Sequence, residues 1–81
     1  MKLTASQVKV LRYMASRLAK YTHPTGPEIS MELGHVAYWA AGKLASLEKR
    51  GLVERLGLSS SGAICFRITP AGRNALDKER G

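Results

Sequence analysis

The sequence predicts an α+β domain in which three helices are followed by a β-hairpin and a short closing helix. Three segments up to residue 50 carry apolar residues at helical spacing, and two capping-box patterns mark helix starts. Between residues 52 and 69, two segments of alternating polarity flank a loop rich in serine and glycine. Because 81 residues with 44% apolar content are enough for one modest core, we expect residues 1–81 to form a single domain.

The first helix is expected to begin at Thr4, because Thr4 and Gln7 have the spacing of a capping box. Pro24 follows Thr22 and His23 and should end this helix, since a proline disfavours helical geometry in the residue before it. Apolar residues recur every three or four positions and predict the buried face: Val8, Leu11, Ala15 and Leu18.

The second helix is expected to begin at Thr25, where Thr25 and Glu28 repeat the capping-box spacing and Pro27 occupies the first turn. Gly34 then allows the sharp turn between two packed helices. The buried edge of this short helix should be formed by two apolar residues one turn apart and bordered by a methionine: Ile29, Leu33 and Met31.

The third helix should span about residues 36–50 and end at Gly51. Its opposite side is available to a partner and carries Tyr38, Gly42, Ala45 and Lys49. His35, in the preceding turn, is expected as a partly buried neutral imidazole, with a pH-sensing role as the alternative. Apolar residues at helical spacing predict the buried face: Val36, Ala40, Leu44 and Leu47.

Two strands and the loop between them predict a hairpin that packs on the helices. The strands are expected at 52–56 and 63–69, and the loop at 58–62. Thr69 as the cap and Pro70 at the first helical position start the closing helix, whose main apolar anchor is Leu76. Residues 77–81 are expected to fray.

Thirteen Lys and Arg against six Asp and Glu give a net charge of +7. This charge favours a polyanionic partner such as nucleic acid, although basic surfaces also serve solubility. No apolar run reaches the roughly 20 residues that span a bilayer. Residues 1–3 lead into a polar helix start rather than a signal peptide. We therefore expect a cytoplasmic protein without a membrane partner.

Cys65 is the single cysteine, so no disulfide can form within the chain, and its place in an alternating strand predicts a small core residue. His23 and His35 are the only histidines, and no spacing of carboxylates completes a metal site around them. The sequence also lacks a nucleophile beside a base, paired buried carboxylates and a glycine-rich phosphate loop. We expect no metal, no cofactor and no enzymatic activity.

The order of elements and three short segments resemble the winged helix-turn-helix DNA-binding superfamily, in particular its MarR-like branch. The segments are Leu33–Gly34 before the turn, LEKRGLVER at 47–55 and ITPAG at 68–72. By this resemblance, the third helix (about 36–50) enters the major groove of DNA, and the hairpin (about 52–69) is a wing on the backbone or minor groove. The resemblance implies sequence-preferring binding of double-stranded DNA by a small transcriptional regulator.

The sequence departs from this branch at both ends. MarR-like regulators dimerise through long terminal helices, whereas here the first helix starts four residues from the terminus and the last is little more than two turns. We therefore expect a minimal form that acts as a monomer, as a homodimer through its first or last helix, or together with another protein. The effector pocket of the family has no counterpart in the sequence, so no small-molecule effector is expected.

The candidate DNA contacts lie in the third helix and the wing. Small residues allow close approach of the backbone, while Tyr38 and Trp39 can reach thymine methyls, sugars or phosphates. Lysines and arginines suit phosphate contacts, so the DNA backbone should supply much of the affinity. The predicted DNA-binding residues are Ala37, Tyr38, Trp39, Ala41, Gly42, Lys43, Ser46, Lys49, Arg50, Arg55 and Arg67.

Two alternatives stay open for the aromatic pair. Trp39 lies about a quarter turn off the buried stripe, so it either contacts DNA or packs under the first helix or the wing. An exposed Tyr38 and Trp39 face among alanine and glycine also has the composition of a protein interface. On that alternative, the domain is a docking module in a replication, recombination or transcription assembly.

Overall fold

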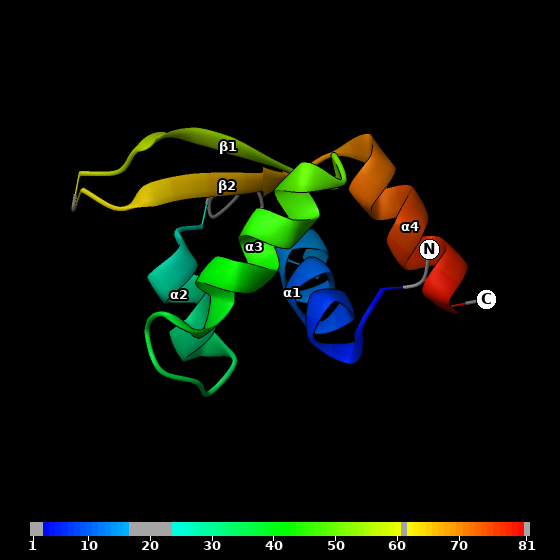
Figure 1. Ribbon diagram of the computed structural model, residues 1–81, viewed down its shortest axis with the longest axis horizontal. Helices are drawn as coiled ribbons and strands as arrows, with labels where there is room; N and C mark the ends of the chain where they lie inside the picture. Colours follow the sequence, from blue (N-terminus) through cyan, green and yellow to red (C-terminus); the bar gives the residue numbers. More distant parts are fainter. Residues whose placement is uncertain (1–2, 17–23, 61, 81) are drawn as a thin grey trace.

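A computed structural model describes residues 3–16, 24–60 and 62–80 of the chain. The order of elements confirms the predicted α+β class, with three helices before a two-stranded antiparallel hairpin and one helix after it (Figure 1). The elements are α1 (Ala5–Ser16), α2 (Gly26–Glu32), α3 (Trp39–Lys49), β1 (Val53–Leu58), β2 (Ile64–Ile68) and α4 (Pro70–Arg80).

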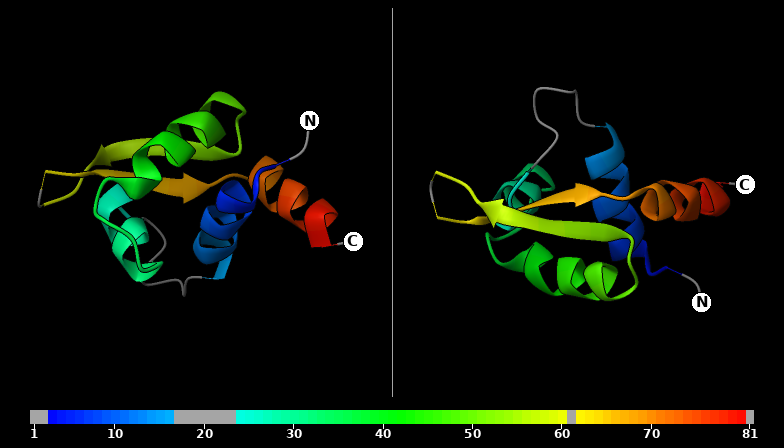
Figure 2. Two further views of the ribbon diagram at one scale, coloured as in Figure 1. Left: turned by 60° about the horizontal axis from the view of Figure 1, so that its bottom comes forward. Right: turned by 90° about the horizontal axis from the view of Figure 1, so that it is seen from above.

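The elements are spread along a long axis of 37 Å, against 23 Å in the other two directions. The first three helices pack together, while the hairpin tip and α4 lie at opposite ends of the long axis (Figure 1). Figure 2 shows the same arrangement from two further directions, with the hairpin beside α3. Each of the six elements contributes to one buried apolar cluster, including Leu11 of α1, Ile29 of α2 and Leu44 of α3.

α1 begins at the predicted capping box: the Gln7 N–H donates to Thr4 Oγ1 at 3.1 Å, and the Thr4 N–H donates to Gln7 Oε1 at 2.9 Å. Its predicted buried face is only partly right, because Val8 and Ala15 are half-buried at the edge of the core. α1 contacts α2, α3, α4 and β2, and these contacts determine which of its side chains are buried. The buried residues of α1 are Gln7, Val10, Leu11 and Met14. Outside the described residues lie Leu18, Thr22 and His23.

α2 also begins at its predicted capping box: the Glu28 N–H donates to Thr25 Oγ1 and the Thr25 N–H donates to Glu28 Oε1, both at 3.2 Å. Ile29 is fully buried, as predicted, and Leu33 is half-buried. The expectation that Met31 borders this edge is wrong, since its side chain is 67% exposed. Two residues from Ile29, Met31 lies on the outer side of the helix.

α3 starts later than predicted. Residues 36–38 form a turn in which the Trp39 N–H donates to the Val36 carbonyl at 2.9 Å, and Gly34 has the positive φ of 82° that the sharp turn requires. Val36 is consequently 56% exposed, so its assignment to the buried face is wrong. The rest of that face is confirmed as buried: Ala40, Leu44 and Leu47.

The end of α3 is the predicted glycine stop. Gly51 has a φ of 75°, its N–H donates to the Glu48 carbonyl at 2.9 Å, and the Leu52 N–H donates to the Leu47 carbonyl at 2.9 Å. These two bonds are the Schellman motif, which satisfies carbonyls that have no partner within the helix. The chain then turns directly into β1.

The hairpin pairs Val53 with Ile68 and Glu54 with Arg67, and its register becomes irregular between Arg55 and Leu58. A short third pairing, which the sequence did not predict, joins the chain before α2 to β2. There the Phe66 N–H donates to the Pro24 carbonyl at 2.9 Å, and Thr25 bridges Cys65.

Cys65 is half-buried, so the expectation that it is a core residue is wrong. In this strand the buried position is the neighbouring Phe66. Successive side chains of a strand point to opposite faces, and packing on the helices places Phe66 on the inner face.

α4 begins as predicted, with the Gly72 N–H donating to Thr69 Oγ1 at 3.0 Å, and Leu76 is its buried anchor. The helix continues to Arg80, so the expectation that residues 77–81 fray is wrong where the structure describes them. α4 packs against α1, and such packing is what mainly stabilises short helices in proteins.

Candidate nucleic-acid interface

The side of α3 that faces away from the core is built from small residues, a tyrosine and a lysine. These positions lie opposite the buried Ala40, Leu44 and Leu47, because an α-helix turns by about 100° per residue. We call them the outer face of α3: Tyr38, Ala41, Gly42, Ala45 and Lys49. All five are exposed, Tyr38 by 79%. No other described helix or strand covers this side of α3 (Figures 1 and 2).

A buried serine fixes where α3 begins. The side chain of Tyr38, the N-cap residue, makes no capping hydrogen bond. Instead Ser30 Oγ, fully buried on α2, accepts the Ala40 N–H at 2.8 Å and donates to the Gly26 carbonyl at 3.0 Å. The hydroxyl thus satisfies one of the donors that a helix start leaves unpaired, and it ties α2 to α3.

Three side chains from the turn and α3 stack on one another. The rings of His35 and Trp39 are parallel within 7°, with centroids 3.9 Å apart, and Lys43 Nζ lies over the Trp39 ring, 4.6 Å from its centroid. Trp39 is half-buried and packs against the core. The imidazole is partly buried, as predicted, and within the described part of the chain its buried Nε2 has no hydrogen-bond partner.

Ser46 lies on the flank of α3 next to α1. Gln7 Nε2 donates to Ser46 Oγ at 2.9 Å, while Gln7 Oε1 accepts from the capping box at the start of α1. Gln7 therefore links the two helices. The Ser46 side chain is exposed but is oriented by this contact.

The two wing arginines are paired with carboxylates. Arg55 donates from Nη2 to Glu48 Oε1 at 2.9 Å and from Nε to Glu48 Oε2 at 3.2 Å, and Arg67 forms an ion pair with Glu54 across the hairpin. The hydrogen bond to Glu48 and its negative charge raise the pKa of Arg55 above its usual value. Residues 56–66, which include the tip, carry no charged side chain.

The C-terminal half of α3 offers a cation beside a surface hollow. The hollow has a volume of about 430 Å³ and is lined by Ala45, Ser46, Glu48 and Lys49. Lys49 is exposed and has no ion-pair partner among the described residues, whereas Arg50, the C-cap residue, is half-buried. Positive charge is therefore available at this end of the outer face.

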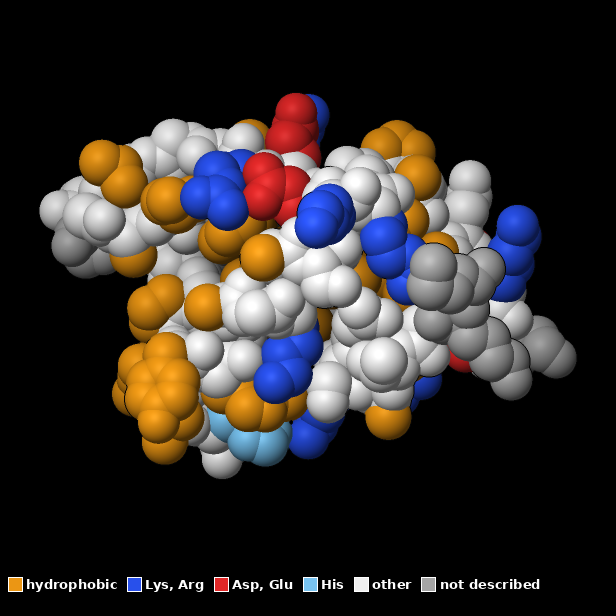
Figure 3. Space-filling model, viewed as in Figure 1, with side chains coloured by type: hydrophobic (Ala, Val, Ile, Leu, Met, Phe, Trp, Pro, Cys, Tyr) orange, Lys and Arg blue, Asp and Glu red, His pale blue; other side chains and the backbone are white. Residues whose placement is uncertain are grey.

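Apolar side chains are exposed around the start of α3 and at the hairpin. Figure 3 shows hydrophobic side chains gathered over α2 and the turn, next to the histidine, with cationic side chains spread along α3. The large exposed ones are Met31, Val36, Tyr38 and Leu58.

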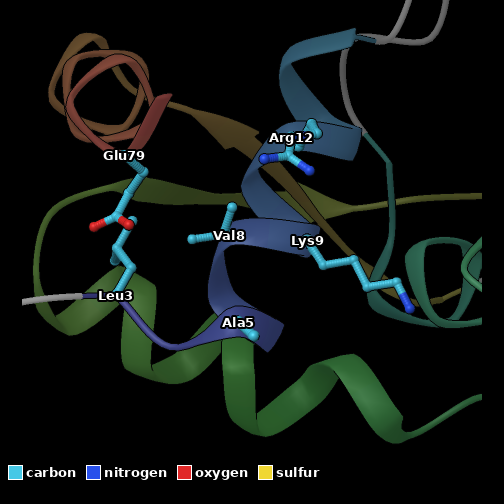
Figure 4. A pocket seen from close by; sticks show the side chains of 6 residues that line it. All are labelled: Leu3, Ala5, Val8, Lys9, Arg12 and Glu79. Atoms are coloured by element: carbon cyan, nitrogen blue, oxygen red, sulfur yellow. The ribbon is translucent and has the colours of Figure 1, made fainter. Parts of the chain in front are cut away.

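A second hollow, of about 550 Å³, lies between the N-terminal segment, α1 and α4 (Figure 4). Glu79 and Leu3 lie next to each other on one side of it, across from Val8 of α1.

Among residues 3–16, 24–60 and 62–80, no group of three or more His, Cys, Asp or Glu could hold a metal ion. No helix in the described part of the chain has the length and apolar character needed to cross a membrane.

No family model matches the sequence, and no curated protein matches it. Solved structures of transcription regulators do match. The repressor CouR bound to a 23-mer DNA duplex is 27% identical, with a TM-score of 0.78 over 98% of this chain and 54% of that chain. The Staphylococcus aureus MepR–DNA complex is 18% identical, with a TM-score of 0.78 over 96% and 62% of the two chains.

A MarR-family regulator from Silicibacter pomeroyi is 18% identical, with a TM-score of 0.77 over 94% of this chain and 49% of that chain. The chain therefore has a MarR-type winged helix-turn-helix fold. This confirms the resemblance seen in the sequence. The chain spans about half the length of the regulators it matches.

In this winged helix-turn-helix, α2, the turn at Gly34 and α3 form the helix-turn-helix, and β1 with β2 forms the wing. Some of the predicted DNA-binding residues are exposed on or beside the outer face: Ala37, Tyr38, Ala41, Gly42 and Lys49. Others contact protein side chains: Trp39, Lys43, Ser46, Arg55 and Arg67.

The contacts of Ser30 and Gln7 with α3 were not among the features predicted from the sequence. Ser30 lies four residues after Gly26, a spacing at which a serine hydroxyl can bond to the backbone carbonyl of the preceding turn. That local signal was available. The partners on α3, Ala40 and Ser46, are 10 and 39 residues away and gave no local signal.

Proposed function

We propose that this chain binds double-stranded DNA with a sequence preference, as the DNA-binding part of a transcriptional regulator. In this proposal α3 lies in the major groove and the wing lies along the backbone or in the minor groove. The observation that carries it is the exposed outer face of α3, which no other described element covers, in a winged helix-turn-helix. The major groove is wide enough to admit an α-helix.

Charge and structural likeness support the same proposal. The net charge of +7 favours a polyanion. Two of the matching regulators, CouR and MepR, are solved with DNA. A DNA-binding regulator of this type acts where the DNA is, so we expect the protein in the cytoplasm, on the nucleoid when bound.

The predicted contact residues divide into base-facing and phosphate-facing groups. Tyr38, Ala41 and Gly42 on the outer face, with Ala37 before it, face the base edges. Lys49 and Arg50 at the end of α3 are placed for phosphates, with Lys43 and Ser46 on the flank. The wing residues Arg55 and Arg67 lie beside phosphates in this proposal, with their charge offset by their carboxylate partners. In this assignment Trp39 supports Lys43 rather than reading a base.

The test is fluorescence anisotropy of a labelled random-sequence duplex, titrated with the protein at several salt concentrations. Binding should weaken log-linearly with salt, because phosphate neutralisation releases counterions. The double variant Lys49→Ala, Arg50→Ala should bind every duplex more weakly, and its slope against log salt should be shallower by about 1.8.

The matched control is Arg73→Ala, Lys78→Ala, which removes two cations from α4 instead. The control should bind like the unaltered chain. Equal slopes for the two double variants would contradict the placement of α3 on DNA. Absence of duplex binding at low salt would overturn the proposed function.

The assembly state belongs to the same proposal. Static light scattering of the protein, alone and with duplex, distinguishes a monomer from a homodimer. A dimer predicts an operator with two half-sites related by the symmetry of the protein, and a monomer predicts one half-site or a second protein beside it. We expect no small-molecule effector and no catalytic activity.

A second candidate is the protein-docking module. It is favoured by the exposed apolar side chains of Met31, Val36 and Tyr38 around the turn. Under this alternative, Tyr38→Ala abolishes a protein complex and leaves DNA affinity intact. Under the proposed function, Tyr38→Ala weakens binding to the preferred duplex instead.

A further inference from the structure

We infer that the outer face of α3 recognises the C5-methyl groups of thymine in the major groove, so that its target duplexes place A·T pairs opposite this face. The inference rests on the proposed DNA binding and adds the chemical class of base that is read.

The composition of the face determines what it can recognise. From Ala37 to Ala45, the exposed positions on this side of α3 are alanine, glycine and Tyr38. Bidentate recognition of guanine uses Arg or Lys, and that of adenine uses Asn or Gln. Lys43 is the one such residue in this stretch, and it is half-buried with its Nζ over the Trp39 ring. The thymine methyl is the apolar feature of a base edge in the major groove, and alanine and aromatic side chains contact it.

The polar side chains on the flank of α3, Lys43 and Ser46, make contacts beside the outer face and do not cover it. Lys43 lies over the Trp39 ring, and Ser46 accepts a hydrogen bond from Gln7, so both are engaged beside the face rather than on it. Lys49 lies beyond Ala45 at the far end of the helix. The polar groups near the centre of the face are therefore held to one side.

The shape of the face permits close approach. A Cβ added at Gly42 would meet no atom within 4 Å, so the space outside this position is open. Alanine and glycine at the centre of the face let the helix backbone lie near the base edges, where a methyl group can be covered.

The same residues fit a protein partner less well. Interface hot spots concentrate in large anchors such as Trp, Tyr and Arg at the centre of the contact. Here the centre is Ala41, Gly42 and Ala45, and the anchor Tyr38 stands at one end. The centre of this face therefore allows close approach of a flat partner surface and lacks a large side chain that could insert into a protein pocket.

The experiment compares two labelled duplexes that differ only in this methyl group: alternating dA–dT, and the same duplex with dU in place of dT. Uracil keeps the hydrogen-bonding edges of thymine and lacks the methyl. The chain should bind the dT duplex more tightly, by roughly four-fold for each methyl that it covers.

A double variant separates direct contact from an effect of the methyl on DNA shape. Ala41→Ser, Ala45→Ser places hydroxyl groups where the methyls would pack, and should bind the two duplexes nearly equally. The matched control Ala5→Ser, Ala71→Ser alters two exposed helical alanines away from α3 and should keep the full preference.

The outcomes separate the inference from the proposed function. Salt-dependent binding with no preference between dT and dU, or a preference that survives in the Ala41→Ser, Ala45→Ser variant, would overturn the inference and leave DNA binding standing. Absence of binding to either duplex at low salt would overturn the proposed function, and the inference with it.

Discussion

The helix-turn-helix and the wing contain polar contacts of two different kinds. In the helix-turn-helix, the Ser30 hydroxyl is fully buried and joins Gly26 to Ala40. At the wing, the contacts are ion pairs whose side chains remain 36% to 55% exposed. The first contact is shielded from water, and the others are not.

This difference separates the contacts that stabilise the fold from those that we expect to influence the proposed binding of DNA. Breaking a buried hydrogen bond leaves a polar group unpaired away from water, whereas exposed ion pairs are screened by water and salt and stabilise little. The ion pairs nevertheless set the charge of the wing, because each wing arginine is matched by a carboxylate. We therefore expect buried contacts to dominate the free energy of unfolding, and the wing carboxylates to adjust the salt dependence of the proposed DNA binding.

The largest effect is expected at the root of the wing. A Cβ at Gly72 would lie 2.1 Å from the Leu52 carbonyl oxygen and 2.8 Å from Ile68 Cγ1, so Gly72→Ala must push α4 away from the hairpin. The free energy of unfolding, from urea denaturation, should fall by about 3 kcal/mol. The control Gly42→Ala has open space and should gain about 0.5–1 kcal/mol from its helix propensity. Equal free energies of unfolding for the Gly72→Ala and Gly42→Ala chains would contradict the close packing of α4 on the hairpin at Gly72.

The next effect tests the buried contact of the helix-turn-helix. Ser30→Ala removes the acceptor of the Ala40 N–H and should lower the free energy of unfolding by about 2 kcal/mol, because the donor is left buried and unpaired. Ser60→Ala, at an exposed position of the wing loop, should stay within about 0.5 kcal/mol in the same denaturation experiment. A Ser30→Ala chain as stable as the Ser60→Ala chain would show that the hydroxyl does not hold α2 to α3.

The smallest effect is expected from releasing a wing arginine. Glu54→Gln leaves Arg67 without its carboxylate, so DNA affinity should rise and the slope of log affinity against log salt should steepen by about 0.9. Glu79→Gln on α4 makes the same charge change away from the wing and should leave the slope unaltered. If both variants steepened the slope alike, the effect would be one of net charge, and Arg67 would not lie at the DNA.

Local signals in the sequence predicted most of the helix starts and stops. The capping boxes at Thr4 and Thr25 are present, Gly34 and Gly51 have the positive φ that their turns require, and α4 begins at Pro70. All of these signals act between residues within about one helical turn of each other. Both partners of each contact therefore lie in one short segment, and the residue pattern of that segment is enough to predict the contact.

Packing between the elements set the limits of the buried faces and decided which site residues contact other side chains. Met14 is buried where Ala15 was expected, Val36 is exposed, and α3 begins three residues late. The Ser30 contact spans 10 residues, and the Arg67 ion pair spans 13. Such contacts depend on how helices and strands pack after they have formed, and that packing has no counterpart in local spacing.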